Sequence, residues 1–235
     1  MGCARAPRIG LLAAAFGAAC ALGAACASGS ASGPGAKAAG AGEEDYLRWM
    51  AFEVRLNETV LLRWHERDMP LRVFLPRPPE GLFEQPEAIY DSVRDGVLDW
   101  TDVAAPGIPS FVFVEDIGEA DIPIVWSHGR DGYWYVAHCL YAANLAQRFG
   151  VTQILVTGRW SESRTADLHE VYAAMLHEMG HALGLGGHSP DPEDVMFPSV
   201  ARRTREGLGP RDRATLARLY ARPVGAHVVG ARRLR

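Results

Sequence analysis

The chain has 235 residues, of which 48% are hydrophobic, and it carries a formal net charge of −4. This apolar share is enough for a folded core and argues against a disordered chain. The mild acidity provides no basic surface, so we expect no nucleic-acid partner and no electrostatic binding to an anionic membrane.

The first 26 residues predict export. Arg5 and Arg8 precede the apolar run 9–16, and small residues follow as far as Cys26. A basic start, a short apolar core and a small-residue exit are typical of a secretory signal peptide. Glycines interrupt the apolar run, which is shorter than the ~20 apolar residues of a permanent membrane span.

Cys26, at the exit of this segment, leaves two outcomes open. Residues 22–26 resemble a bacterial lipoprotein box, in which Cys26 becomes the lipidated first residue of the mature protein. Gly23 departs from that pattern, which prefers a larger apolar residue at its position. Cleavage after Ala25 or Ala27 is the alternative. We therefore expect an exported protein, either a cell-envelope lipoprotein or a secreted one, with membrane contact only through a lipid on Cys26.

Composition divides the rest of the chain. Residues 27–44 are rich in glycine, alanine and serine, which predicts a flexible linker. Residues 45–225 have the length of one ordinary domain, and residues 226–235 form a basic tail. Cys139 is the single cysteine of this domain, because the other three lie in the leader, so no disulfide is expected within it.

Hydrophobic patterning predicts a mixed α/β (α+β) domain, in which a sheet packs against helices. Short alternating or β-branched runs predict strands, and apolar residues at helical spacing predict helices. The expected strands are 71–75, 111–114, 121–126, 133–141 and 153–157. The expected helices are 86–103, 165–183 and 211–220.

The predicted helix 165–183 contains His177, Glu178 and His181 in the pattern His-Glu-x-x-His. Side chains four residues apart share a helix face at about 5–6 Å, so both imidazoles can reach one zinc ion at ~2.0–2.1 Å. Glu178 lies beside them and can meet a zinc-bound water without being a ligand. Gly184 permits a sharp turn, after which His188 can return as the third ligand.

The segment from His177 to Ser189 resembles the zinc-binding signature of metzincins, and especially of matrixin-like proteases. Residues 194–198 resemble the Met-turn of that family, with Met196 under the metal. The resemblance extends over about residues 60–222. It implies a zincin-like catalytic domain with a twisted, mostly parallel sheet, an active-site helix and a C-terminal helix.

The chain departs from the family pattern in the third ligand. The pattern usually places this histidine six residues after the second one, whereas position 187 is glycine and His188 comes one residue later. Two consecutive glycines make the wider loop accessible. If His188 does not bind, Asp191 or Glu193 can compete as an oxygen ligand.

The residues support the hypothesis of a zinc-dependent endopeptidase. Zinc polarises the scissile carbonyl and lowers the pKa of its bound water to ~7, and Glu178 transfers that water's proton to the leaving amine. The resemblance implies that the strand near 135–140 pairs with an extended protein or peptide substrate. An inactive zinc-binding lipoprotein and a zinc hydrolase with a non-peptide substrate are the alternatives.

A second metal has weaker support. His128 and His138, with Asp131 between them, resemble a structural zinc site of matrixins, but their spacing is shorter than the family's. We therefore expect one catalytic zinc and leave a second zinc or a calcium unsupported. No pattern in the sequence indicates an oligomeric state.

Overall fold

The computed structural model describes residues 44–55, 58–129, 135–143, 149–199 and 207–227. The predicted signal peptide with Cys26, most of the linker, most of the basic tail and Asp131 lie outside these ranges. Within the described ranges, no helix is long and apolar enough to cross a membrane.

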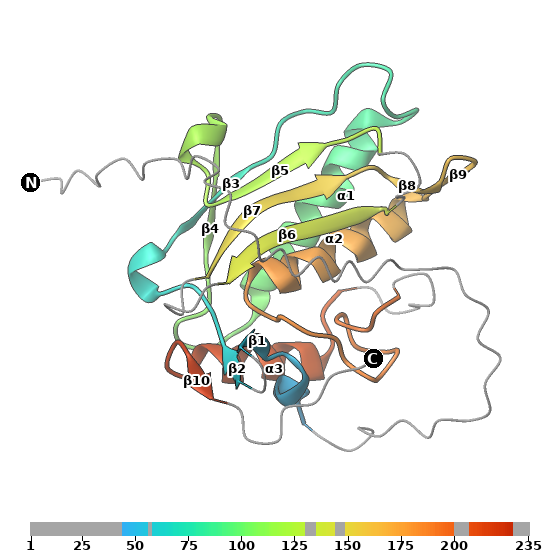
Figure 1. The fold of residues 1–235 in the computed structure, drawn as a ribbon. Coiled ribbons are helices and arrows are strands. Elements are labelled where there is room, and N and C mark those ends of the chain that lie inside the picture. The colour runs from blue at the N-terminus through green and yellow to red at the C-terminus, as the bar shows by residue number, and fades with distance from the viewer. Residues whose placement is uncertain (1–43, 56–57, 130–134, 144–148, 200–206, 228–235) are drawn as a thin grey trace, which may run out of the picture.

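A five-stranded sheet forms the centre of the fold (Figure 1). In spatial order its strands are β4 (Phe111–Val114), β3 (Leu71–Phe74), β5 (Ile122–Trp126), β7 (Phe149–Val156) and β6 (Ala137–Ala143). β3 runs parallel to β4 and β5, and β5 runs parallel to β7, whereas β6 is antiparallel to β7. The predicted mostly parallel sheet is confirmed, and β6 forms one of its two edges.

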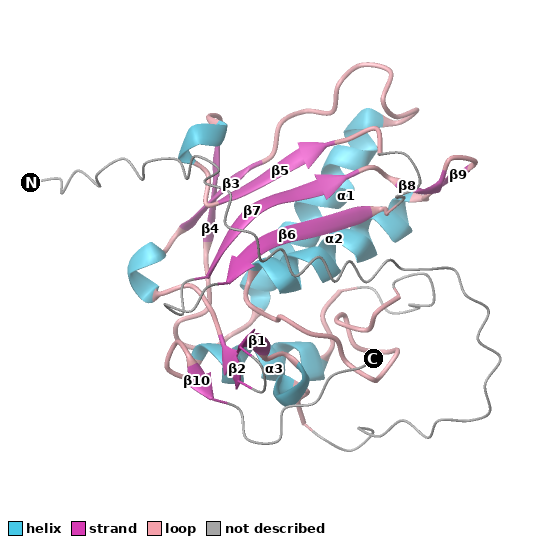
Figure 2. Cartoon of the chain, viewed as in Figure 1, coloured by secondary structure: helices cyan, strands magenta, loops and turns pink. Residues whose placement is uncertain are grey.

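Two helices, α1 (Pro86–Leu98) and α2 (Leu168–Ala182), lie together on one face of the sheet (Figure 2). They approach closely at Gly96, where a Cβ atom would lie only 3.0 Å from Cβ of Met175. Trp100 is fully buried beside this contact, and its indole Nε1–H donates to the carbonyl of Leu176 at 3.0 Å. α2 also packs against β6, which places the edge of the sheet beside the helix that carries the histidine motif.

A second, antiparallel sheet lies beside helix α3 (Pro210–Tyr220), below the central sheet in Figure 1. It consists of β1 (Phe52–Arg55), β2 (Glu58–Leu61) and β10 (Ala226–His227). The remaining short elements are η1 (Leu47–Trp49), η2 (Glu66–Asp68), η3 (Asp99–Asp102), η4 (Ile117–Glu119), β8 (Arg159–Ser161) and β9 (Arg164–Thr165). The sequence analysis predicted neither this sheet nor these short elements as separate units.

Several predicted boundaries differ from the observed ones. The helix expected over 86–103 ends at Leu98 and continues as the 3₁₀ helix η3. The strand expected from residue 153 already begins at Phe149, because β6 pairs with it along its full length. α2 begins at Leu168 rather than at residue 165, since Asp167 and Glu170 form a capping box across its first turn.

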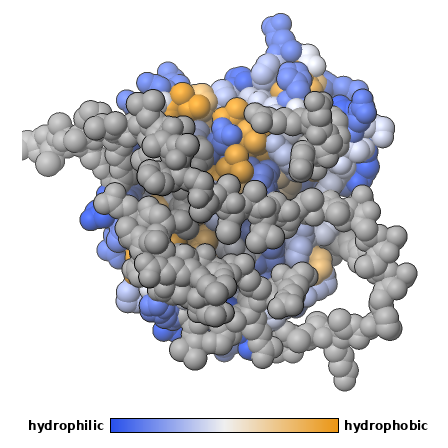
Figure 3. Space-filling view, viewed as in Figure 1, coloured by the Kyte–Doolittle hydropathy of each residue, from blue (hydrophilic) through white to orange (hydrophobic). Residues whose placement is uncertain are grey.

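Apolar side chains reach the surface at both edges of the central sheet. Among the described residues, Val112, Phe113 and Ile117 are exposed at or beside β4, and Leu140 and Tyr141 are exposed on β6. Figure 3 shows apolar areas between hydrophilic ones on the face in view. The apolar edge at β6 matters for function because it lies beside the histidine motif.

Candidate metal centre

Helix α2 positions His177, Glu178 and His181 in the interior of the protein. Their relative exposures are 5%, 9% and 8%, so all three polar side chains are buried between the helix and its neighbours. The apolar residues Val171, Met175 and Met179 of the same helix are fully buried and anchor it. Burying a polar side chain costs free energy unless the side chain is hydrogen-bonded or binds a ligand, so we expect a partner for each of the three.

The helix ends in a turn that brings His188 back. Gly184 has φ +105°, a backbone conformation that L side chains rarely adopt. The N–H of Gly184 donates to the carbonyl of His181, and the N–H of Leu185 donates to the carbonyl of Gly180, each at 3.0 Å. This is a Schellman arrangement. Helix α2 therefore ends just before Gly184, the residue at which the sequence predicted a turn.

His177, His181 and His188 meet in one cluster. Their ring centroids are separated by 4.8 Å, 5.3 Å and 5.1 Å. One ligand atom from each residue lies within 4.8 Å of the others, and no other group of metal-ligating side chains forms in the described ranges. The wider loop therefore delivers His188 to the two helical histidines, whereas neither Asp191 nor Glu193 joins the cluster.

Backbone carbonyls orient two of the rings. Nδ1 of His177 lies 2.8 Å from the carbonyl oxygen of Val195, and Nδ1 of His181 lies 2.6 Å from that of Leu185. A carbonyl only accepts, so each Nδ1 carries the proton and each Nε2 keeps a lone pair for a metal. Such partners fix the tautomer and the ring orientation of metal ligands in many metalloproteins.

The protonation state of the cluster also suits a metal. Burial lowers the pKa of His181 well below its usual range, and the neighbouring His177 and His188 lower it further. Burial also lowers the pKa of His188. Neutral imidazoles are the form that binds a metal, and three of them with an open fourth position fit the donor set of a catalytic zinc. The residues present therefore fit Zn²⁺.

Glu178 lies between this cluster and the edge of the sheet. Its Oε2 accepts a hydrogen bond of 2.7 Å from the backbone N–H of Cys139 in β6. Burial raises the pKa of Glu178 to about 8, and the hydrogen bond from Cys139 opposes that shift. A cation held by the three histidines would favour the carboxylate and lower this pKa.

Met196 lies under the helix that carries the ligands, as the sequence resemblance implied. Its side chain is fully buried. A Cβ atom at Gly180 would lie 2.3 Å from Sδ of Met196 and 3.2 Å from Trp100. Gly180 thus leaves the space that Met196 fills, a role that the sequence analysis did not assign to this position.

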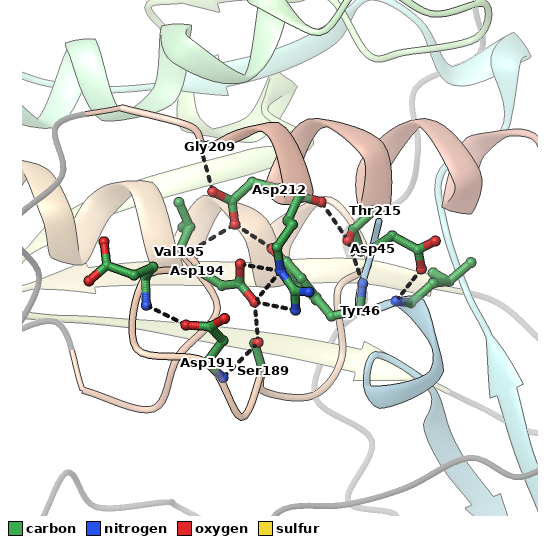
Figure 4. A network of polar contacts seen from close by, with 12 residues as sticks. Asp45, Tyr46, Ser189, Asp191, Asp194, Val195, Gly209, Asp212 and Thr215 are labelled. Atoms are coloured by element: carbon green, nitrogen blue, oxygen red, sulfur yellow. Dashed lines mark hydrogen bonds and ion pairs between the residues drawn. The ribbon is translucent and has the colours of Figure 1, made fainter. Parts of the chain in front are cut away.

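Sequence reasoning also missed the buried carboxylates that hold the loop between α2 and α3 (Figure 4). Asp212 accepts hydrogen bonds from the N–H groups of Val195 at 2.8 Å and Gly209 at 2.7 Å. Asp194 accepts from the hydroxyl of Ser189 and pairs with Arg211, whose Nε lies 2.9 Å from Oδ1. The spacing of Gly209 and Asp212 matches a helix cap, but no local pattern reveals the bond to Val195.

The proposed second metal site gains no support from the described residues. His128 is exposed, whereas His138 is partly buried on β6, and neither belongs to a cluster of metal-ligating side chains there. Asp131 lies outside the described ranges. Burial lowers the pKa of His138.

Comparison with known proteins gives the same assignment. A matrixin family profile matches residues 63–221, well over half of the chain. Matrilysin from Felis catus is 38% identical over 66 residues, which are 27% of this chain and 24% of that protein. Matrilysin from Homo sapiens is 46% identical over 41 residues, which are 17% of this chain and 15% of that protein. The aligned part is thus a quarter or less of each relative.

The profile match includes the helix with His177 and His181, the turn at Gly184, His188, Met196 and helix α3. The resemblance predicted from the sequence is therefore confirmed, together with its fold. On this match and this fold, the chain belongs to the matrixin family.

Proposed function

We propose that the protein is a zinc-dependent endopeptidase that hydrolyses peptide bonds in exported proteins or peptides. One observation carries the proposal: a buried carboxylate, Glu178, lies beside three histidines that converge on one point. A site that only stored or sensed zinc would need the histidines but no acid or base next to them.

Zinc bound by His177, His181 and His188 would supply a Lewis acid for the scissile carbonyl and for the attacking water. The residues of the chain then have separate tasks. The carbonyls of Val195 and Leu185 hold the rings of His177 and His181. Glu178 accepts a proton from the attacking water and passes it to the leaving amine, a role worth roughly 10²–10⁴-fold in rate.

The edge strand β6 supports a peptide as the substrate. An edge strand presents unpaired backbone groups, to which an extended peptide can add as a further strand. The N–H of Cys139 already points away from β7 and reaches Glu178, so this edge faces the catalytic carboxylate. Beside it, the exposed ring of Tyr141 lies 6.1 Å from the ring of His181. Apolar side chains of a substrate would find a contact surface there.

Export sets the class of substrate within this proposal. The basic and apolar pattern of the first 26 residues and the box at Cys26 support transport out of the cytoplasm, either as a lipoprotein or as a secreted protein. The substrates are then proteins or peptides of the cell envelope or of the surroundings. Mass spectrometry of the mature N-terminus distinguishes a lipid on Cys26 from cleavage after Ala25 or Ala27.

The test is a paired assay on the purified wild-type protein and the variant Glu178→Ala. Zinc content and cleavage of unfolded casein are measured on the same samples, with and without a chelator. We expect one zinc per chain in both proteins, cleavage by the wild type alone, and loss of that cleavage with the chelator. Zinc without cleavage of casein or of a peptide library would favour a zinc-binding lipoprotein or a hydrolase of other substrates.

A further inference from the structure

The segment 46–52, which we call the N-terminal strap, contacts the loop that carries His188 and reaches the Met-turn through Asp212 of helix α3. The strap contains η1 and the first residue of β1, and it precedes the residues matched by the family profile. Tyr46, Met50 and Phe52 of the strap are buried, with exposures of 5% or less. The strap is therefore part of the folded domain, although it lies outside the segment by which the family is recognised.

The first contact is with the loop that carries His188. The N–H of Gly186 donates to the carbonyl of Met50 at 3.0 Å. A Cβ atom at Gly187 would lie 1.9 Å from the carbonyl oxygen of Trp49, and a Cβ atom at Gly186 would lie 2.6 Å from the ring of Phe52. The two glycines of the widened loop are thus required because the strap passes directly against them.

The second contact leads to His177. The hydroxyl of Tyr46 donates to Oδ1 of Asp212 at 2.7 Å, and the same oxygen accepts from the N–H of Val195 at 2.8 Å (Figure 4). The carbonyl of Val195 in turn accepts from Nδ1 of His177 at 2.8 Å. The strap is therefore linked to a metal-ligating ring by hydrogen bonds to Asp212 and by the backbone of Val195.

Helix α3 fixes the strap at its start. The N–H of Tyr46 donates to Oγ1 of Thr215 at 3.0 Å, and Arg218 pairs with Asp45 at 2.9 Å. Asp212 and Thr215 are fully buried, so the bonds that Tyr46 makes to them form away from water, where they hold their geometry best, whereas the Arg218–Asp45 pair is partly exposed. These contacts hold the strap in one position relative to the loop of His188 and to the Met-turn.

We propose that the N-terminal strap positions the metal ligands and so sets the metal affinity of the centre. Its backbone at Trp49 and Met50 holds the loop of His188, and Tyr46 acts through Asp212 and Val195 on the ring of His177. Groups that hydrogen-bond to metal ligands commonly contribute 10–100-fold to metal affinity. Tyr46 lies two hydrogen bonds beyond Val195, the residue that contacts the ligand, so we expect an effect no larger than the lower limit of that range, about tenfold.

The first test compares Tyr46→Phe with the matched control Tyr172→Phe in the full-length protein. Each variant removes a tyrosine hydroxyl that donates to an aspartate, Asp212 for Tyr46 and Asp99 for Tyr172, and Asp212 is the aspartate that bonds to the backbone of Val195 beside His177. The zinc Kd is measured by competition with a chromophoric chelator. We expect about a tenfold higher Kd for Tyr46→Phe and a Kd within twofold of wild type for the control.

Absorption of the Co²⁺-loaded proteins is the second readout, because the visible bands of Co²⁺ respond to ligand geometry and not to global stability. These bands should change for Tyr46→Phe and stay unchanged for Tyr172→Phe. An unchanged Kd together with unchanged bands for Tyr46→Phe would overturn the path through Asp212.

A second pair tests the loop of His188 and also decides the matter if Tyr46→Phe fails to fold. Gly187→Ala forces a methyl group against the carbonyl of Trp49, whereas Gly150→Ala introduces one where no atom lies within 4 Å. We expect a higher zinc Kd for Gly187→Ala and an unchanged zinc Kd for Gly150→Ala. A Kd equal to that of Gly150→Ala would show that the strap does not position this loop.

This inference rests on the metal centre of the proposed function but not on proteolysis. Zinc and Co²⁺ binding are measured without substrate, so a wild-type protein that binds zinc and cleaves nothing refutes only the endopeptidase. Unchanged binding by the strap variants of an active wild type refutes only the role of the strap.

Discussion

Replacing Gly180 by alanine tests the packing beneath the metal centre. In an exposed helix this change stabilises a protein by about 1 kcal/mol, because alanine is the better helix former. Here the new Cβ would lie 2.3 Å from Sδ of the fully buried Met196. Overpacking of this kind typically costs about 1–3 kcal/mol. The net expectation is a loss of roughly 0–2 kcal/mol in the free energy of unfolding.

The variant Met196→Ala provides the background that isolates this clash. Shortening Met196 should cost about 2–5 kcal/mol by itself, because it leaves a cavity. In that background Gly180→Ala meets no sulfur atom, although its Cβ still lies 3.2 Å from Trp100, and it should stabilise the protein by at most about 1 kcal/mol. The two changes are thus coupled, and the effect of Gly180→Ala reverses its sign between the two backgrounds.

The assay is urea unfolding of the four metal-free proteins, followed by circular dichroism. Metal-free samples keep differences in zinc affinity out of the measured stability. If Gly180→Ala stabilised both backgrounds equally, Met196 would not occupy the space beneath Gly180. The packing of Met196 against helix α2 described above would then be wrong.

Three further predictions concern single residues. Relative to a Glu178→Gln variant, the metal-free wild-type protein should lose up to about 1.4 kcal/mol of stability per pH unit between the unfolded-state pKa of Glu178, 4.5, and its folded-state pKa of about 8, because the folded state keeps the proton longer. Urea unfolding at pH 5, 6.5 and 8 should show this slope, and a Glu178→Gln variant with the same slope would refute it. His188→Ala should weaken zinc binding by more than about 100-fold, because losing a ligand costs more affinity than losing the hydrogen-bond partner of a ligand. Asp191→Ala should leave the zinc affinity unchanged. If a chelator competition titration ranked the two variants the other way, the aspartate would be the ligand. Trp64→Phe should lower the free energy of unfolding by about 1–3 kcal/mol, because the carbonyl of Ala182 loses its 2.8 Å hydrogen bond from the buried indole. An unchanged free energy of unfolding in urea would contradict this.

The sequence predicts what local periodicity controls. Apolar alternation located β3 and β5, and helical spacing located α1, α2 and α3, because each of these elements buries one face against the core. The short apolar run Phe111–Val114 located β4, which is only partly buried at the edge of the sheet. The positions of His177, Glu178 and His181 follow from helix geometry alone, since residues i and i+4 share a face. Family resemblance added the Met-turn at Met196.

The remaining features depend on contacts between distant parts of the chain. The strap is short, and its burial results from Gly186, Gly187 and α3, which come more than a hundred residues later. Asp212 carries an ordinary helix-cap pattern, and its bond to Val195 depends on how α3 packs against the Met-turn. Both the burial of the strap and the bond between Asp212 and Val195 join distant parts of the chain, so no short stretch of sequence could predict them.

Hydrolysis in ¹⁸O-labelled water is the most direct test of a zinc peptidase that depends on Glu178. Unfolded casein is incubated with wild-type protein and Glu178→Ala, each with the same measured zinc content, and the new termini are identified by mass spectrometry. We predict new carboxyl termini that carry ¹⁸O from the solvent in the wild-type reaction and none in the variant reaction. No new termini from the zinc-loaded wild type, or equal numbers from Glu178→Ala, would contradict the account.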